Sequence, residues 1–409
     1  MSTTTKKDVN SLSVILPMLS ASLFLTSYSV VNGVIPQLGR ALNVDNTSAE
    51  LLSTTPSLTA LVTLLISPAL ARFFGLKKVI GAGLFLVGVT AFVPMFATNF
   101  AVVMAARVLF GMGLGLYNSL VITLIQMMYS GNRRATLLGI RGATENLGQA
   151  IMTALVSVFV LIAGWQGAFI VYLFAFPVLI WFWIQVPDVH LDKTGSSDME
   201  DEGNVNTYPD KTSPLLGAFC VCAALYMVFF NSINVRFAEI AQNILHDKTH
   251  DSSVIISVGI LFAVVAGFVY GFLEKKFGDN TYYVGMGIYF LGSLLVSLAG
   301  NSYAVLVAGF FLFNFPGPIL GPFLCNRIPK YATKSSQAFW STMIILSFHV
   351  GIFVSPLAMK AITAITGSTN PAAPFPWFTA GFAIMIAVVA VWQLTHRKAP
   401  TAKAAVATA

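Results

Sequence analysis

Apolar runs long enough to cross a lipid bilayer recur along the whole chain. A spanning helix needs about 20 mostly apolar residues, and twelve candidates can be placed, some of them interrupted by polar residues. They begin near residues 12, 50, 79, 101, 136 and 166, and again near 214, 251, 281, 302, 336 and 375. Only 10% of the residues are charged, against about 25% in soluble domains. The sequence therefore predicts an all-α integral membrane protein with twelve transmembrane helices.

A polar segment divides these runs into two sets of six. Residues 187–213 contain seven acids against two lysines and no apolar run, a composition typical of a solvated linker. We expect an N-terminal six-helix bundle over 1–186, a cytoplasmic acidic linker over 187–213, a C-terminal six-helix bundle over 214–396 and a disordered cytoplasmic tail over 397–409.

Lysine and arginine residues concentrate in one set of loops. If both termini are cytoplasmic, 17 of the 23 basic residues fall on the cytoplasmic side and only Arg40, Lys248 and Lys360 on the outer side. The positive-inside rule then predicts an even number of crossings with both ends in the cytoplasm. Membrane orientation also explains the net charge of +7 without nucleic acid. We expect a multi-pass monomer in the lipid bilayer of the plasma membrane.

The two halves contain a recurring segment. "ALARFFGLKKVIGAGLFLVG" in the first half and "YGFLEKKFGDNTYYVGMGIYFLG" in the second place Gly75 and Gly278 at corresponding positions, 203 residues apart. Parallel repeats of this kind occur in transporters in which one half rocks against the other around a central cavity. The repeat therefore predicts two pseudo-symmetric bundles.

Several motifs give the chain a family resemblance. "LARFFGLKK" has a tight turn with flanking basic residues, "RVLFGMGLG" contains Arg107, Gly111 and Gly113, and "GWQGAFIVYLFAFP" forms a corner between the fifth and sixth runs. In these motifs, and over nearly its whole length, the chain resembles the major facilitator superfamily. It departs from the family where Arg72 and Lys275 stand in place of an acid before the turn glycine.

The resemblance implies that helices one, four, seven and ten line a central cavity. Polar side chains on these runs are then candidate substrate contacts, because unpaired amides are disfavoured in lipid. The alternative is interhelical hydrogen bonding, which contributes about 0.6 kcal/mol on average. The candidates are Tyr28, Asn32, Asn118, Asn231, Asn234 and Asn314.

Arg107 falls inside the fourth run, where a cation costs at least ~2.5 kcal/mol on insertion scales. The resemblance implies a role for it in substrate binding or proton coupling. The alternative is an arginine that forms a salt bridge or caps backbone carbonyls and only fixes helix packing.

Two charge pairs and one histidine are candidates for proton coupling or gating. In "GIRGATENLGQ", Arg141 and Glu145 are four residues apart, and in "NSINVRFAEIAQN", Arg236 and Glu239 are three apart. Both spacings place the partners on one helical face. We favour an interhelical clamp for the first pair over a protonatable Glu145, and we also keep Arg236 as a substrate candidate. His349 is either a proton carrier or a structural residue.

We therefore predict a secondary transporter that moves a small organic solute by alternating access, coupled to protons. The alternatives are efflux of multiple lipophilic drugs by proton antiport and a membrane receptor that binds without transport. A membrane enzyme would need a converging reactive set and a channel would need a filter; neither is recognisable. We expect no cofactor, no metal and no nucleic acid. Pro316, Pro318 and Pro322 predict a break in the tenth helix.

Overall fold

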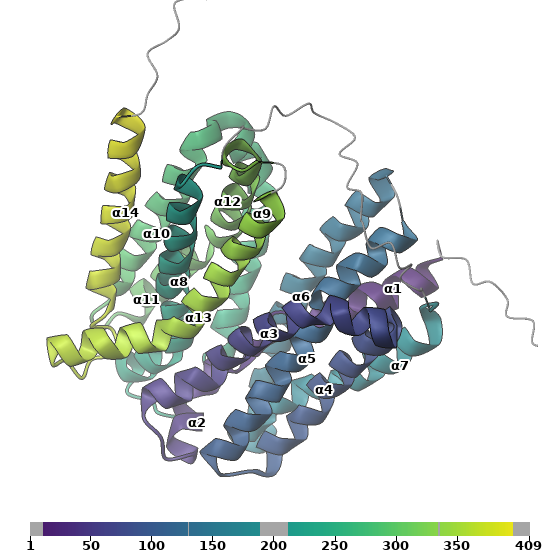
Figure 1. Cartoon of the computed structure of the whole chain (residues 1–409). Helices are drawn as coiled ribbons and strands as arrows, with labels where there is room; N and C mark the ends of the chain where they lie inside the picture. Colours follow the sequence, from purple (N-terminus) through teal and green to yellow (C-terminus); the bar gives the residue numbers. More distant parts are fainter. Residues whose placement is uncertain (1–10, 130, 189–211, 334–335, 396–409) are drawn as a thin grey trace, which may run out of the picture.

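The computed structural model describes residues 11–129, 131–188, 212–333 and 336–395, and the regular structure in these ranges is helical. The helices form two halves, α1 to α7 and α8 to α14 (Figure 1). The expected linker and tail lie almost entirely outside the described residues, so their boundaries stay predictions.

The N-terminal half contains seven α-helices and three 3-10 helices. These are α1 (Leu12–Ser20), η1 (Ala21–Phe24), η2 (Ser27–Val34), α2 (Ile35–Ala41), α3 (Asn46–Phe74), α4 (Leu76–Phe96), α5 (Phe100–Met128), α6 (Gly131–Ala163), η3 (Gly164–Phe174) and α7 (Ala175–Gln185).

The C-terminal half has a similar sequence of elements. These are α8 (Leu215–Leu245), α9 (Ser253–Phe277), η4 (Gly278–Asn280), α10 (Thr281–Ser297), α11 (Tyr303–Asn314), α12 (Gly317–Tyr331), α13 (Gln337–Thr366) and α14 (Phe375–Thr395).

The lengths of these helices agree with a membrane-spanning fold. Among the described residues, seven helical segments are long and apolar enough to cross a bilayer, and a bent pair raises this number to eight; three shorter apolar helices accompany them. One of the seven segments covers α6, η3 and α7. Because α6 packs along η3, the chain reverses near Gly164, whose φ of +60° suits glycine. The all-α membrane fold is confirmed, and the count of twelve crossings stays a prediction.

Two of the expected helices are interrupted. The break in the tenth is confirmed, because α11 ends at Asn314 and α12 begins at Gly317. The first expected helix is also broken: Leu12–Phe24 and Ser27–Ala41 meet at 45°, which we did not predict. Ser27 and Ser29 donate to backbone carbonyls three residues earlier, at 2.5 and 3.2 Å. Such bonds offer the backbone an alternative to a regular helix.

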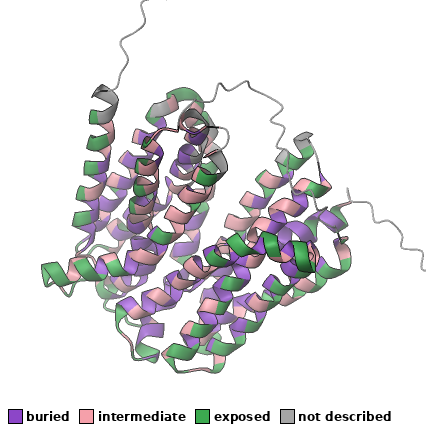
Figure 2. Ribbon diagram, viewed as in Figure 1, coloured by how far each residue is buried: buried purple, intermediate pink, exposed green. Residues whose placement is uncertain are grey.

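The outer faces of the halves are apolar. Large side chains such as Phe73, Phe96 and Leu161 are at least 80% exposed, while buried residues follow the packed interior of each half (Figure 2). Exposed apolar surface on this scale is disfavoured in water and suits contact with lipid tails.

Glycines of the fourth expected helix allow close packing inside the N-terminal half. A β-carbon at Gly115 of α5 would lie 2.0 Å from the Ala60 carbonyl oxygen of α3, and one at Gly113 would lie 3.0 Å from the Gly83 carbonyl oxygen of α4. The "GMGLG" motif is therefore a packing motif, in which small residues let helix backbones approach each other.

Adding one methyl group at this contact is expected to destabilise the protein. Gly115→Ala should cost about 1–3 kcal/mol through overpacking and lower Tm in detergent by several degrees. Gly139→Ala is the matched control: a β-carbon at Gly139 of α6 would meet no atom within 4 Å, and alanine favours helix. An equal Tm change in both variants would contradict the packing role of Gly115.

The two halves meet at one end of the molecule. The elements in contact across the halves include α3 with α13, η2 with α8 and α9, α2 with α8, and α6 with α9. We call this the sealed end; it carries the α2–α3, α8–α9 and α13–α14 connections. Toward the start of α6 and the end of α14, the ribbons of the two halves diverge (Figure 1).

Candidate functional site

A cavity of about 280 Å³ lies between the halves. From the N-terminal half it is lined by Thr26, Tyr28, Ser29, Asn32, Asn146 and Gln149. From the C-terminal half it is lined by Tyr226, Met227, Phe230, Asn231, Asn234, Ile256, Ile260, Ala263, Asn314, Gly317, Gly321 and Phe348. These residues include amides from both halves, and none of them carries a formal charge.

The interrupted helices place polar groups in this cavity. Asn32 lies on η2, and its side chain accepts a hydrogen bond from Ser53 of α3. Asn314 is the last residue of α11, so the break that follows brings it and Gly317 to the cavity wall. On α8, Asn231 donates to the Ser355 hydroxyl at 2.8 Å.

Most of the predicted substrate contacts converge here. Tyr28, Asn32, Asn231, Asn234 and Asn314 all line the cavity, although they come from three separate parts of the sequence. Their role in binding remains a prediction. Asn146 and Gln149 also line the cavity but were not predicted as substrate contacts. Both lie within about one helical turn of Glu145, in a polar stretch of an otherwise apolar run. That position could have identified them as candidates.

Arg107 lies outside the cavity lining. Its side chain is 1% exposed, and it donates to the Leu52 carbonyl at 2.6 Å, the Tyr172 hydroxyl at 3.4 Å and the Tyr28 carbonyl. The arginine thus ties α3 and η3 to the interrupted first helix. This geometry matches the alternative of an arginine that caps backbone carbonyls. The bond to the Tyr28 carbonyl fixes the backbone of a residue whose own position is in the cavity lining.

Arg141, Glu145 and Asn118 form a network within the N-terminal half. Arg141 Nη1 lies 3.5 Å from Glu145 Oε2, and Arg141 Nη2 donates to Asn118 Oδ1 at 2.5 Å. Asn118 therefore contacts an arginine and does not line the cavity. The network connects α5 with α6 and does not bridge the two halves in this structure, so its action as a clamp stays a prediction.

A buried ion cluster joins the halves at the sealed end. Arg236 Nε of α8 lies 2.8 Å from Glu50 Oε1 of α3 and 3.8 Å from Glu239 Oε2. Arg236 and Glu50 are only 5% and 1% exposed, and Asn46 of α3 donates to Glu239. The expected Arg236–Glu239 pair is present, but Arg236 contacts Glu50 more closely and does not line the cavity. We call Glu50, Arg236 and Glu239 the ion cluster.

Glu50 was not among the residues predicted from the sequence. It is a single acid near the start of an apolar run, in "NTSAELLSTTPSL". Because an ionised group inside an apolar run needs a partner, Glu50 could have been selected as a candidate in the same way as Arg236.

Further side-chain contacts cross the sealed end. Arg40 donates to Gln242 Oε1 at 3.1 Å, and His349 Nδ1 lies 3.0 Å from the Ser57 hydroxyl. His349, a candidate proton carrier, thus connects α13 to α3 just beyond the ion cluster along α3. Together these contacts close one side of the cavity.

Comparison with known proteins decides the family. The sequence model of the Major Facilitator Superfamily matches residues 18–233, more than half of the chain. This chain belongs to the Major Facilitator Superfamily. The resemblance noted in the sequence is therefore confirmed. A search of curated proteins gave no match.

Solved structures of superfamily members share the fold. A mutant of the nucleoside transporter NupG has a TM-score of 0.76 at 12% identity, covering 93% of this chain and 99% of that one. A POT family transporter bound to a thioalcohol-conjugated peptide has a TM-score of 0.73 at 14% identity, covering 94% and 96%. The human organic anion transporter MFSD10 (TETRAN) has a TM-score of 0.62 at 16% identity, covering 92% and 99%. At these identities the likeness establishes the fold alone. The indication of a membrane transporter comes from membership of the superfamily.

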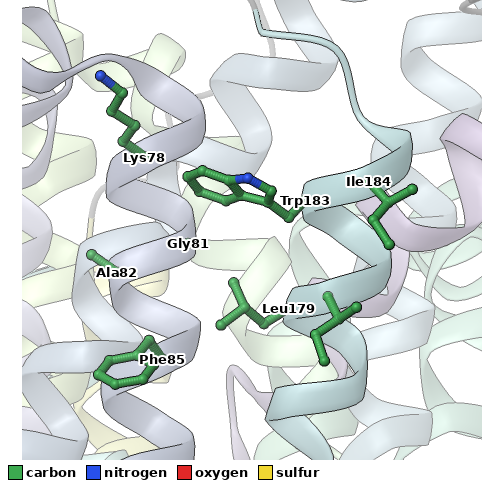
Figure 3. A pocket seen from close by; sticks show the side chains of 8 residues that line it. Lys78, Gly81, Ala82, Phe85, Leu179, Trp183 and Ile184 are labelled. Atoms are coloured by element: carbon green, nitrogen blue, oxygen red, sulfur yellow. The ribbon is translucent and has the colours of Figure 1, made fainter.

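This superfamily member has another hollow, away from the seam between its halves. It lies between α4 and α7, has a volume of about 420 Å³ and is lined mostly by apolar side chains such as Phe85 and Trp183, with Lys78 at its edge (Figure 3). Ile180 and Ile184 beside it are about 60% exposed. The hollow thus belongs to the exposed apolar exterior, and we do not assign solute binding to it.

An exposed ion pair at the sealed end gives a pH prediction for this superfamily member. The Ser48 hydroxyl and then Lys360 lower the pKa of the Asp45 carboxyl, and Lys360 Nζ lies 3.3 Å from Asp45 Oδ2 across the halves. Because Lys360 of the other half contributes to this lowering, the pair stabilises contact between the halves at neutral pH. That contribution is lost as the pH falls through the lowered pKa.

Both partners of this pair are more than half exposed, so its contribution is small, about 0.2–1 kcal/mol. We expect Lys360→Gln to change the population of the closed sealed end less than about fivefold at pH 7, and progressively less as the pH falls through the lowered pKa of Asp45. Distances between spin labels across this end would measure it. A large effect that persists at acid pH would contradict the assignment.

Proposed function

We propose that this chain is a secondary transporter that moves a small organic solute across the membrane by alternating access. The observation that carries the proposal is the cavity between two halves joined at one end by a buried ion cluster. A cavity bounded by both halves changes its access when the halves rock against each other. By the expected topology, the sealed end faces the outside of the cell.

The ion cluster is the element that must separate for access to change. While Glu50 and Arg236 are in contact, each buried charge is paired with the opposite charge of the other. When the halves part, both groups gain water. The seal is therefore a two-state contact between α3 and α8, and a ligand or a proton that favours one state shifts the population.

Proton coupling is the second part of the proposal. Glu50 has one carboxylate oxygen, Oε2, that is buried and has no hydrogen-bond partner among the described residues, so a proton can be held there without breaking the Oε1 contact. Protonation removes the charge that faces Arg236 and weakens the seal between the halves. Glu239 shares Arg236 and is the second carboxylate candidate, with Glu145 and His349 as candidates elsewhere.

Efflux of lipophilic drugs and binding without transport are the competing functions. The uncharged, amide-lined cavity favours a polar solute over a lipophilic one, since each amide left unpaired by an apolar ligand is a desolvated polar group. A receptor on the same scaffold would bind its ligand without flux.

Transport in proteoliposomes tests the proposal. Uptake of a bound solute is expected to exceed equilibrium under an imposed pH gradient, and a protonophore should abolish the accumulation. Glu50→Gln is expected to keep solute exchange but lose accumulation, because it cannot bind the coupled proton. Glu274→Gln is the control: Glu274 pairs with Arg327 at 2.9 Å within one half.

Three outcomes would contradict parts of this proposal. Binding without any flux would make the chain a receptor. Accumulation that survives the protonophore would point to another coupling ion. Equal pH-driven accumulation by the Glu50→Gln variant and the wild type would remove Glu50 from the coupling step.

A further inference from the structure

Four of the asparagine side chains around the cavity are held through their nitrogens. Asn146, Asn234 and Asn314 each donate through their NH₂ groups to the backbone carbonyl four residues earlier, at 3.0, 3.0 and 2.9 Å. Asn231 donates to the Ile352 carbonyl at 3.4 Å and the Ser355 hydroxyl at 2.8 Å. A backbone carbonyl can only accept a hydrogen bond. The position of the nitrogen in each of these amides is therefore determined, and so is that of the oxygen.

The consequence is a set of available acceptors. Within the described part of the chain, the side-chain oxygens of these four asparagines accept no hydrogen bond from the protein. They come from both halves, one from α6 and three from α8 and α11. A carbonyl oxygen with no donor is unfavourable once water is excluded. A molecule that displaces water from this cavity must therefore bring N–H or O–H groups.

The remaining wall offers an apolar surface. Phe230 and Phe348 line the cavity with Ile256 and Ile260, and Tyr226 packs edge-on against Phe348 with ring centroids 5.8 Å apart. A solute that faces this wall needs an apolar or flat side in addition to its donors.

Charge is absent from the described lining. The nearby ionised groups already have partners: Arg141 contacts Glu145 and Asn118, and Arg107 contacts two carbonyls and a hydroxyl. An anion would face carbonyl oxygens, which repel it, and a cation would find acceptor oxygens but no carboxylate in the lining to balance its charge. The volume of about 280 Å³ lies slightly below the usual range of ligand pockets, about 300–1,000 Å³, so the solute must be small.

We propose that the solute is a small uncharged molecule that donates several N–H or O–H hydrogen bonds from one edge and has an apolar or flat face. Sugars and nucleosides both have this chemistry. The inference rests on the proposed transport function, because it assigns the solute of the same cavity.

Binding to the purified full-length chain in detergent tests the solute class separately from transport. Four groups of probes are compared by thermal shift: uridine and glucose; their fully methylated forms, which lack donors; uridine monophosphate and glucuronate, which are anionic; and glucosamine, which is cationic. Of the four groups, only the first, uridine and glucose, is expected to stabilise the protein. The comparison of uridine with glucose distinguishes a heterocyclic solute from a polyol.

Stabilisation by a methylated, anionic or cationic probe that equals or exceeds that of its parent would overturn the proposal, as would the absence of binding by both parents. Binding without flux in proteoliposomes would refute transport but leave the solute class intact. Accumulation of an anionic solute would support transport but refute the proposed solute class.

Single variants test the acceptor oxygens. Asn234→Leu and Asn314→Leu are each expected to lower the affinity for the parent probe about tenfold, since each removes one buried acceptor. For a probe methylated at the donor that contacts the replaced asparagine, the same substitution should change the affinity less than twofold, because that hydrogen bond is already absent. Asn301→Leu, at an exposed position in the connection between α10 and α11, should leave the affinity for both probes unchanged. If the asparagine variants fold, as shown by an unaltered gel-filtration profile, and bind the parent normally, the acceptor role is wrong.

Discussion

Replacing Arg236 with methionine is expected to reduce the closed population of the sealed end by about 100-fold or more. Removing one partner of a buried ion pair costs about 3–5 kcal/mol, because the other charge is left buried and unpaired. Glu50 is 1% exposed beside Arg236 but gains water when the halves separate. The cost therefore falls on the closed state alone, and every 1.4 kcal/mol changes a population ratio tenfold.

The distance between the ends of the two halves measures this change. Spin labels at Thr98 and Asn301, both exposed in connections at the sealed end, should report a longer distance in Arg236→Met than in the wild type. The matched control is the double variant Glu50→Leu with Arg236→Met. Replacing both members of a buried pair by apolar groups is often neutral or stabilising, so the double variant should close again.

The comparison between single and double variants separates charge from packing. If the double variant stays as open as Arg236→Met, the loss comes from the arginine's packing and hydrogen bonds, and the ion cluster does not hold the seal. If neither variant opens, the contacts of Arg40 and His349 are sufficient, and the two-state element lies elsewhere along α3 and α13.

Local chemistry allowed much of the fold and of the cavity to be predicted. Apolar runs predict helices because lipid tolerates only backbone whose polar groups are paired, and Pro316 predicts the break before α12. Asn32, Asn234 and Asn314 were recognisable because an amide inside such a run needs a polar surrounding. Each of these predictions concerns a single residue and depends only on the residues next to it in the sequence.

Pairing across long sequence distances was not predictable in the same way. Glu50 and Arg236 are 186 residues apart in the chain, and each looks like an isolated charge until α3 and α8 are placed together. Arg236 also has Glu239 three residues away, a local partner that satisfies the sequence argument without Glu50. Similarly, nothing in the sequence around Arg107 shows that Tyr28 of the interrupted first helix accepts one of its hydrogen bonds.

Replacing Arg107 with alanine is expected to lower Tm by roughly 6–12 °C. The side chain is fully buried and donates to Leu52, Tyr172 and Tyr28, and a hydrogen bond to a charged group contributes about 1.5–3 kcal/mol. Removing a cation from the membrane interior recovers about 2.5–3.5 kcal/mol, so the net loss is about 3 kcal/mol. For a domain of 150–250 residues, each kcal/mol corresponds to about 2–4 °C.

Arg107→Lys should be intermediate, because an ammonium group lacks the planar fork that reaches three separate acceptors. Arg72→Ala, which removes an exposed arginine of α3, should leave Tm unchanged. Transport kinetics decide between the two roles considered for Arg107. A capping arginine supports Tyr28 and the interrupted first helix, so its loss lowers Tm and the amount of active protein together. A solute-binding arginine would instead raise KM in a variant of normal Tm, and that result would return Arg107 to the site.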